Sequence, residues 1–129
     1  MKDVKILVVD DSSALLSTLE DILAGENYSV ATASDAATAE QQFVSVKPDI
    51  VLLDVNLPDG NGLTITSQLR KQQRANEWLP ILLMSSDATV DDHLAGYKAG
   101  CDDYLSKPFD PRILLAKLAV VRRNLDILQ

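Results

Sequence analysis

The alternation of short apolar runs with helix-patterned segments is the feature that most constrains the fold of this chain. Apolar runs occupy residues 4–9, 28–33, 50–53, 81–84 and 104–105. Short runs bounded by polar or turn residues are typical of buried strands in a parallel sheet. Between them, apolar residues recur at helical spacing, and capping residues such as Ser12 or Ser13 and Ser34 or Asp35 mark helix starts. The pattern therefore predicts strands and helices in strict alternation.

Five strands alternating with five helices predict right-handed βαβ crossovers and a doubly wound sheet. We expect an α/β fold, namely a flavodoxin-like five-stranded parallel sheet in the order 2-1-3-4-5 with five flanking helices. The segment 57–62 is dense in Pro, Asp, Asn and Gly and is expected to be a loop. A length of 129 residues with 47% hydrophobic residues fits one domain with a sizeable core.

Polar side chains stand where the predicted strands end. Asp10 and Asp11 follow the first strand, Asp54 ends the third, Ser85 ends the fourth and Lys107 follows the fifth. Ligands of open α/β sheets bind beyond the carboxyl ends of the strands, so these side chains are expected to converge at one rim. Gathered carboxylates repel one another unless a cation joins them or one is covalently modified.

These residue types predict phosphoryl chemistry with a divalent cation. Mg²⁺, or Mn²⁺, prefers oxygen ligands, so we expect Asp11 and Asp54 to bind it directly and Asp10 through water. A carboxylate is a competent nucleophile toward phosphorus, and the central Asp54 is the best candidate. The Lys107 ammonium would neutralise charge on the transferring group, and the Ser85 hydroxyl would bond a phosphoryl oxygen.

A longer set of motifs follows in a fixed order and identifies a resemblance over about residues 3–121. The set comprises Asp10-Asp11, Asp54, Leu57-Pro58-Asp59-Gly60 with Gly62, Ser85, Ala99-Gly100, Asp103-Tyr104 and Lys107-Pro108-Phe109. Each motif alone is weak, but the ordered set resembles the receiver domain of two-component response regulators, including the chemotaxis regulators. We expect residues 1–121 to form this domain, with residues 122–129 extending the last helix as a linker to an output domain.

The resemblance implies a role for each residue of the acidic site. Asp54 would accept a phosphoryl group from the phosphohistidine of a sensor histidine kinase or a histidine phosphotransfer protein. Asp11, Asp54 and the backbone carbonyl of Asn56 would bind Mg²⁺, with Asp10 helping through water. Lys107 would contact the phosphoryl group, and its peptide bond to the following proline is expected to be cis.

The resemblance also implies a signalling switch rather than an enzyme that turns over a separate substrate. Ser85 would be the switch hydroxyl and Tyr104 the aromatic that changes rotamer with phosphorylation. The surface formed by the helix at 90–99, the strand at 104–105 and the last helix would signal or dimerise. Catalysis would be limited to the domain's own phosphotransfer and autodephosphorylation.

Several positions depart from the family pattern or flank the site. Ser86 stands where a small Ala is usual, and its hydroxyl would slow phosphodonor entry or offer another hydrogen bond. Cys101 stands where Ala is frequent and is expected to be a harmless buried substitution. Asn56 and Asp87 flank the phosphoryl position, and two small polar residues there suggest a short-lived phosphoryl group. His93 is expected to be exposed and uninvolved.

The last helix carries a second signal, an apolar seam with the 4, 3, 4, 3 spacing of a coiled coil. Its members are Leu114, Leu118, Val121, Leu125 and Leu128. Packing on the sheet explains the first half of the seam. The apolar continuation leaves dimerisation through this helix as a second route to a homodimer.

Composition excludes several classes of partner. A net charge of −7 argues against direct nucleic-acid contact from this segment, which would need a basic face. The single cysteine allows no intrachain disulfide and favours a reducing, intracellular setting. The first apolar run is too short for a signal-peptide core or a membrane span, so we expect a cytoplasmic protein with no membrane contact.

Two other functions compete with the phosphoryl switch. A phosphohydrolase of the haloacid dehalogenase type also uses a nucleophilic Asp and Mg²⁺, but it needs a second Asp two residues further on, where this chain has Asn56 after Asp54. A degenerate receiver would serve only as a phosphorylation-independent binding scaffold. The presence of Asp54, Asp11, Ser85 and Lys107 argues against that alternative.

Overall fold

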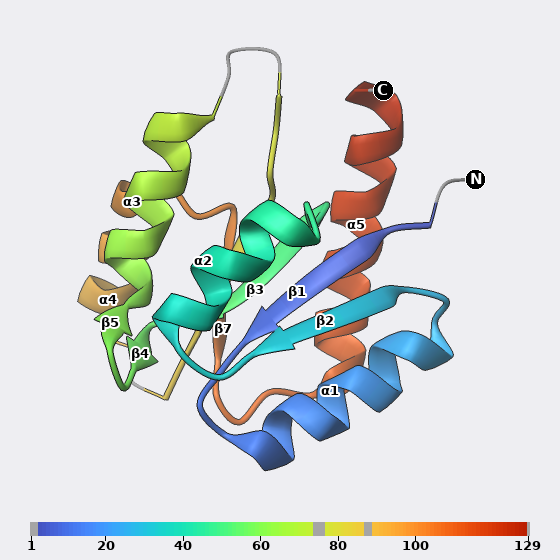
Figure 1. Ribbon diagram of the computed structural model, residues 1–129, viewed down its shortest axis with the longest axis horizontal. Helices are drawn as coiled ribbons and strands as arrows, with labels where there is room; N and C mark the ends of the chain where they lie inside the picture. Colours follow the sequence, from blue (N-terminus) through green and yellow to red (C-terminus); the bar gives the residue numbers. More distant parts are fainter. Residues whose placement is uncertain (1–2, 74–76, 87–88, 129) are drawn as a thin grey trace.

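The computed structural model describes residues 3–73, 77–86 and 89–128, and its elements follow the predicted alternation (Figure 1). The strands are β1 (Lys5–Val9), β2 (Ser29–Ala33), β3 (Ile50–Asp54), β4 (Asn56–Leu57), β5 (Gly60–Asn61), β6 (Ile81–Ser85) and β7 (Asp103–Ser106). The helices are α1 (Ser13–Gly25), α2 (Ala36–Ser45), α3 (Gly62–Gln72), α4 (Val90–Ala99) and α5 (Pro111–Leu128).

The main sheet confirms the predicted topology. Its five parallel strands lie in the order β2-β1-β3-β6-β7, which is the predicted 2-1-3-4-5 order with two short strands counted in between. Those two, β4 and β5, pair antiparallel and, apart from Asn56, lie inside residues 57–62, which the sequence predicts as loop only. Strands of two residues are too short to carry an apolar alternation, so pattern analysis misses them.

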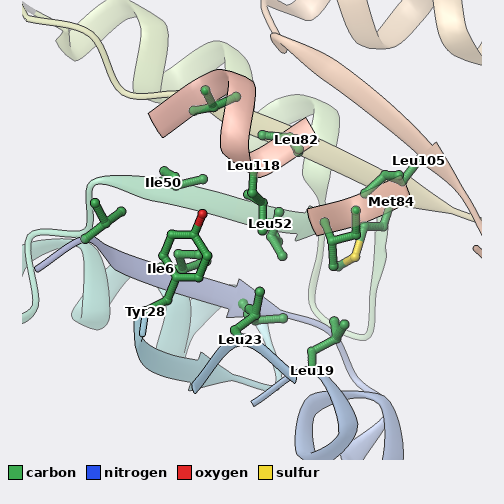
Figure 2. Close-up of a cluster of buried hydrophobic side chains, with 14 of the residues drawn as sticks. Ile6, Leu19, Leu23, Tyr28, Ile50, Leu52, Leu82, Met84, Leu105 and Leu118 are labelled. Atoms are coloured by element: carbon green, nitrogen blue, oxygen red, sulfur yellow. The ribbon is translucent and has the colours of Figure 1, made fainter. Parts of the chain in front are cut away.

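Helices cover both faces of the sheet and create two cores (Figure 1). In the first core, side chains of α1 and α5 meet one face of the strands, and Figure 2 shows Leu19 and Leu23 of α1 near Ile6 and Leu52 of the sheet, with Leu118 of α5 across from them. In the second core, α2 and α3 cover the other face. Every residue of the central strand β3 is buried, which explains the apolar run of residues 50–53 that precedes Asp54.

Capping side chains fix where the helices start beyond the sheet. The Ser12 hydroxyl accepts a hydrogen bond from the Leu15 N–H at 3.2 Å, and the Asp35 carboxylate accepts one from the Thr38 N–H at 2.7 Å. Each cap satisfies an N–H group that has no partner within its helix. Of the two candidates in each loop, the structure therefore uses Ser12 and Asp35.

The seam of α5 packs against the sheet along most of its length. Leu114 and Leu118 have no exposed surface, and Val121 and Leu125 are 8% and 7% exposed. The side chain of Leu128 lies outside the described residues. Among the helices that the structure describes, none has the length and apolar character needed to cross a membrane.

Candidate functional site

Three carboxylates meet at the carboxyl edge of the sheet. Asp54 is the last residue of β3, and Asp10 and Asp11 follow β1, the strand beside it. Asp10 is fully buried, Asp54 is 5% exposed and Asp11 is exposed. One oxygen from each carboxylate lies within 4.8 Å of the others. The structure thus brings together the acidic residues that the sequence singled out.

Lys107 reaches this acidic cluster from the loop after β7. Its Nζ donates hydrogen bonds to Asp10 Oδ2 and, at 3.2 Å, to Asp54 Oδ2. Its backbone N–H donates to the Ser85 carbonyl at 2.8 Å, and its peptide bond to Pro108 is cis, as the resemblance implies. One cation therefore bridges two buried carboxylates that would otherwise repel each other.

Backbone N–H groups hold the other oxygen of each buried carboxylate. The Ser12 N–H donates to Asp10 Oδ1 at 2.9 Å, and the Asn56 N–H donates to Asp54 Oδ1 at 3.1 Å. Each carboxylate is thus fixed between the backbone on one side and Lys107 on the other. This orientation reduces the reorganisation that a reaction at Asp54 would require.

The electrostatics of the cluster favour an additional positive charge. Burial raises the pKa of the Asp54 carboxyl and the Asp10 charge raises it further, which outweighs the opposing Asn56 N–H and Lys107. Burial lowers the pKa of Lys107, but its hydrogen bonds and charge interactions with Asp10 and Asp54 reverse this and raise it overall. A bound cation would relieve both the burial of Asp54 and its repulsion from Asp10.

The donor set fits a hard divalent cation such as Mg²⁺. All three side chains offer carboxylate oxygens, and Asp11, the exposed member, gives the cluster an opening to solvent. Asn56 lies two residues beyond Asp54 at the start of β4, and its carbonyl stays a predicted ligand.

The two predicted switch residues occupy neighbouring strands. Ser85 ends β6 at the carboxyl edge, is 2% exposed, and lies in register with Ser106 of β7. Tyr104 is in β7, in register with Leu83, and the residue is 6% exposed and belongs to the second core. Ser85 therefore belongs to the rim of the site, whereas the Tyr104 ring lies inside the α4 side of the sheet.

His93 corrects one expectation from the sequence, because it is half-buried rather than exposed. It is half-buried in α4, and its ring contacts the Tyr104 ring edge to face, with centroids 4.3 Å apart and planes at 78°. Gly96, one turn further along α4, lies directly against the same tyrosine. A lone histidine on a weakly patterned helix gives no sign of this contact; the only hint is the glycine three residues on.

The structure describes two of the three remaining positions that the sequence singled out. Ser86 is exposed, and Asp87 lies outside the described residues. Cys101 is buried, as predicted, and burial raises the pKa of its thiol to about 11. A protonated, buried thiol is chemically inert, so Cys101 has no part in the chemistry of the site.

Comparisons with known proteins agree with this geometry. The sequence model of the response regulator receiver domain family matches residues 6–119. The chain belongs to this family. It is 37% identical over 123 residues to the alkaline phosphatase synthesis transcriptional regulatory protein PhoP of Bacillus subtilis, covering 95% of this chain and 50% of PhoP. It is 39% identical over 121 residues to the transcriptional regulatory protein PrrA of Mycobacterium tuberculosis, covering 93% and 51%.

Solved receiver structures have the same fold. The BeF3-activated N-terminal receiver domain of Klebsiella pneumoniae RstA superposes with a TM-score of 0.82 at 31% identity, covering 90% of this chain and 96% of that one. The chain spans about half the length of the curated relatives it matches. The resemblance seen in the sequence is confirmed: this is a receiver domain of the two-component type, and such domains are signalling switches.

Proposed function

We propose that Asp54 is the phosphoacceptor of this receiver domain. The observation that carries the proposal is the position of its carboxylate, which is buried among Asp10, Asp11 and Lys107 and held by the Asn56 N–H. Burial and fixed orientation support a nucleophile aimed at one incoming group. The family supports the general role of a receiver as a switch.

The transfer step is a displacement at phosphorus. A carboxylate oxygen of Asp54 forms a bond to the phosphorus of a phosphohistidine as the P–N bond breaks. The imidazole nitrogen keeps the electron pair and takes a proton from solvent. The product is an acyl phosphate on Asp54, and attack of water on its phosphorus returns the carboxylate and releases inorganic phosphate. The donor is a sensor histidine kinase or a histidine phosphotransfer protein.

Several groups around Asp54 would neutralise the negative charge that develops during phosphoryl transfer. Asp11, Asp54 and the Asn56 carbonyl would hold Mg²⁺ or Mn²⁺, with Asp10 acting through water, and the cation would supply positive charge to the transferring oxygens. The Lys107 ammonium, which pairs with Asp54 in the unphosphorylated chain, moves its hydrogen bond to a phosphoryl oxygen. Both neutralise charge that develops during transfer.

The phosphoryl group then changes the surface beside the site. It adds a charge of about −1.5 to −2 and strong acceptor oxygens, which draw the Ser85 hydroxyl toward Asp54. Tyr104 then changes rotamer, and the surface of α4, β7 and α5 changes its affinity for a partner or for a second copy of the chain. The seam of α5 offers a second homodimer contact. Asn56 leaves room for attacking water, so we propose a short-lived phosphoryl group, which a half-life of many hours in Mg²⁺ would contradict.

Domain organisation follows the same proposal. Residues 1–121 carry the switch, and residues 122–129 extend α5 toward an output segment. The relatives PhoP and PrrA are named as transcriptional regulators, so nucleic-acid contact, where it occurs, belongs to a segment other than this acidic one.

The test is phosphorylation by a small donor, read by intact mass. The native chain is incubated with acetyl phosphate and Mg²⁺, beside Asp54→Ala and a control, Asp21→Asn, at an exposed position of α1. We expect one added phosphoryl group on the native and Asp21→Asn chains, none on Asp54→Ala, and none when EDTA removes Mg²⁺.

Other outcomes favour the competing functions. Absence of the added mass from the native chain and from Ser86→Ala indicates a binding scaffold that has lost the chemistry. Added mass on Ser86→Ala alone shows that Ser86 restricts small donors. Steady hydrolysis of a phosphate ester beyond one equivalent indicates a phosphohydrolase.

A further inference from the structure

Helix α4 buries little of its own surface against the sheet. Of its ten residues, all of them described, only Gly96 is buried. Val90, Leu94 and Tyr97 are 73%, 61% and 48% exposed, so the large apolar residues of the helix contribute little to the core. Helix α4 meets β7 through a hydrogen bond from the Tyr97 hydroxyl to Asp103 Oδ1 at 3.4 Å and through packing against the Tyr104 ring.

The Tyr104 ring lies close to the α4 backbone, to Leu83 and to His93. A methyl group at Gly96 would lie 2.9 Å from Cδ2 and 3.0 Å from Cε2 of Tyr104, so the α4 backbone touches the ring. The same methyl would lie 3.2 Å from Leu83 Cδ1, which places Leu83 next to the ring from β6. His93 covers a further part of it, edge to face at 4.3 Å between centroids.

Of these contacts, only the one with His93 comes from a side chain of α4. Gly96 sets how closely the helix approaches but has no side chain that follows the ring. Edge-to-face geometry is the favourable arrangement for aromatic pairs, because the positive edge of one ring meets the negative face of the other. The His93 contact is lost if the tyrosine leaves its buried rotamer, so the rotamer and the position of α4 depend on each other.

We propose that His93 is a positioning residue for Tyr104, holding its ring in the buried rotamer and thereby linking the phosphoryl state of Asp54 to α4. The link to phosphorylation rests on the proposed function. The ring contact itself does not, because it exists in the unphosphorylated chain. A histidine that only fills space would stabilise α4 without influencing the tyrosine rotamer.

The experiment follows the tyrosine signals by aromatic ¹³C NMR. The chain has three tyrosines, and Tyr104→Phe assigns the relevant signal. His93→Ala is compared with the native chain, with His93→Phe, which keeps a ring edge, and with Leu94→Ala at the exposed neighbouring position. The free energy of an edge-to-face pair corresponds to a shift of about two- to tenfold in the ratio of the buried to the exposed Tyr104 rotamer.

We expect His93→Ala to shift that ratio, His93→Phe to restore it and Leu94→Ala to leave it unchanged. Acetyl phosphate and Mg²⁺ should then move the Tyr104 signal less in His93→Ala than in the native chain. His93→Leu, which fills the space without a ring, guards against a poorly folded alanine variant and should behave like His93→Ala. Native-like Tyr104 signals in His93→Ala, or in His93→Leu, would overturn the proposal.

The two proposals fail in different ways. If the native chain gains no phosphoryl group by mass, the proposed function fails while the resting rotamer ratio still tests His93. If the chain gains the group and the ratio does not respond to His93, the inference fails alone.

Discussion

Helices α4 and α5 both flank β7, yet they are attached to the sheet by different means. The α5 helix buries Leu114 and Leu118 completely in the core that it shares with α1. The α4 helix buries only Gly96, which rests on the Tyr104 ring. A fully buried leucine stabilises the fold by about 1.5–3 kcal/mol, whereas a glycine contributes almost no apolar surface. We therefore expect α5 to stay fixed in the core and α4 to be the helix that shifts at the lower cost in free energy.

The two helices also connect to different residues of the site. The loop after Ser85 leads to α4, and the loop after Lys107 leads to α5. Lys107 pairs with Asp10 and Asp54, so a rigid α5 suits a residue that must keep its position. A loosely attached α4 suits the output side of a switch, since weakly held segments are those that move.

The largest expected effect is the difference in stability between matched leucine deletions. Leu118→Ala should lower the free energy of unfolding by about 2–5 kcal/mol, because it leaves a cavity in the α1–α5 core. Leu94→Ala, at a 61% exposed position of α4, should change it by no more than about 0.5 kcal/mol. Urea denaturation measures both, and equal losses would contradict the distinction between the helices.

An intermediate effect is expected where α4 touches the tyrosine. In Gly96→Ala, helix propensity gains about 0.5–1 kcal/mol, but the methyl collides with the Tyr104 ring, and overpacking costs about 1–3 kcal/mol. We expect a net loss of about 1 kcal/mol. In a Tyr104→Ala background the collision with the ring is gone, so the same change should become stabilising. The two backgrounds form a double-mutant cycle, measured by urea denaturation. An equal loss of unfolding free energy in both would show that the Tyr104 ring does not set the distance between α4 and β7.

The last effect is absent at neutral pH and appears only at alkaline pH, at the junction between α4 and β7. Burial raises the pKa of the Cys101 thiol to about 11, above its value of about 8.5 in an unfolded chain. Its contribution to stability is therefore complete below pH 8.5 and is lost as the pH rises through 11. Cys101→Ala should remove this loss, so the native and variant curves of unfolding free energy against pH should converge or cross above pH 9. Parallel curves up to pH 11 would show that the thiol is not shielded.

Strand positions and the acidic site could be predicted from the sequence because both are local signals. Apolar runs locate the strands, and Asp10, Asp11 and Asp54 follow directly from where those runs end. Parallel topology then places strand ends at one edge, which brings in Ser85 and Lys107 without any further information. The Lys107 bond to Asp10 spans 97 positions of sequence, yet the strand order alone predicts their proximity.

What the sequence could not reveal depends on tertiary packing or on very short elements. The β4–β5 pair has two residues in each strand, too few for a periodic signal. His93 was misjudged because nothing in a weakly amphipathic helix says which residue faces a tyrosine on β7. Gly96 allows α4 to approach the Tyr104 ring closely, and this role is visible only once α4 and β7 are placed together.

Hydrogen exchange read by mass spectrometry, with and without acetyl phosphate and Mg²⁺, tests the central claim most directly. That claim joins Asp54 phosphorylation to movement of α4 against a fixed α5. We predict altered amide exchange in residues 90–106, unchanged exchange in residues 114–125, and no alteration in Asp54→Ala. A chain that carries the phosphoryl group by intact mass and exchanges identically in α4, or changes equally in α4 and α5, would contradict the account.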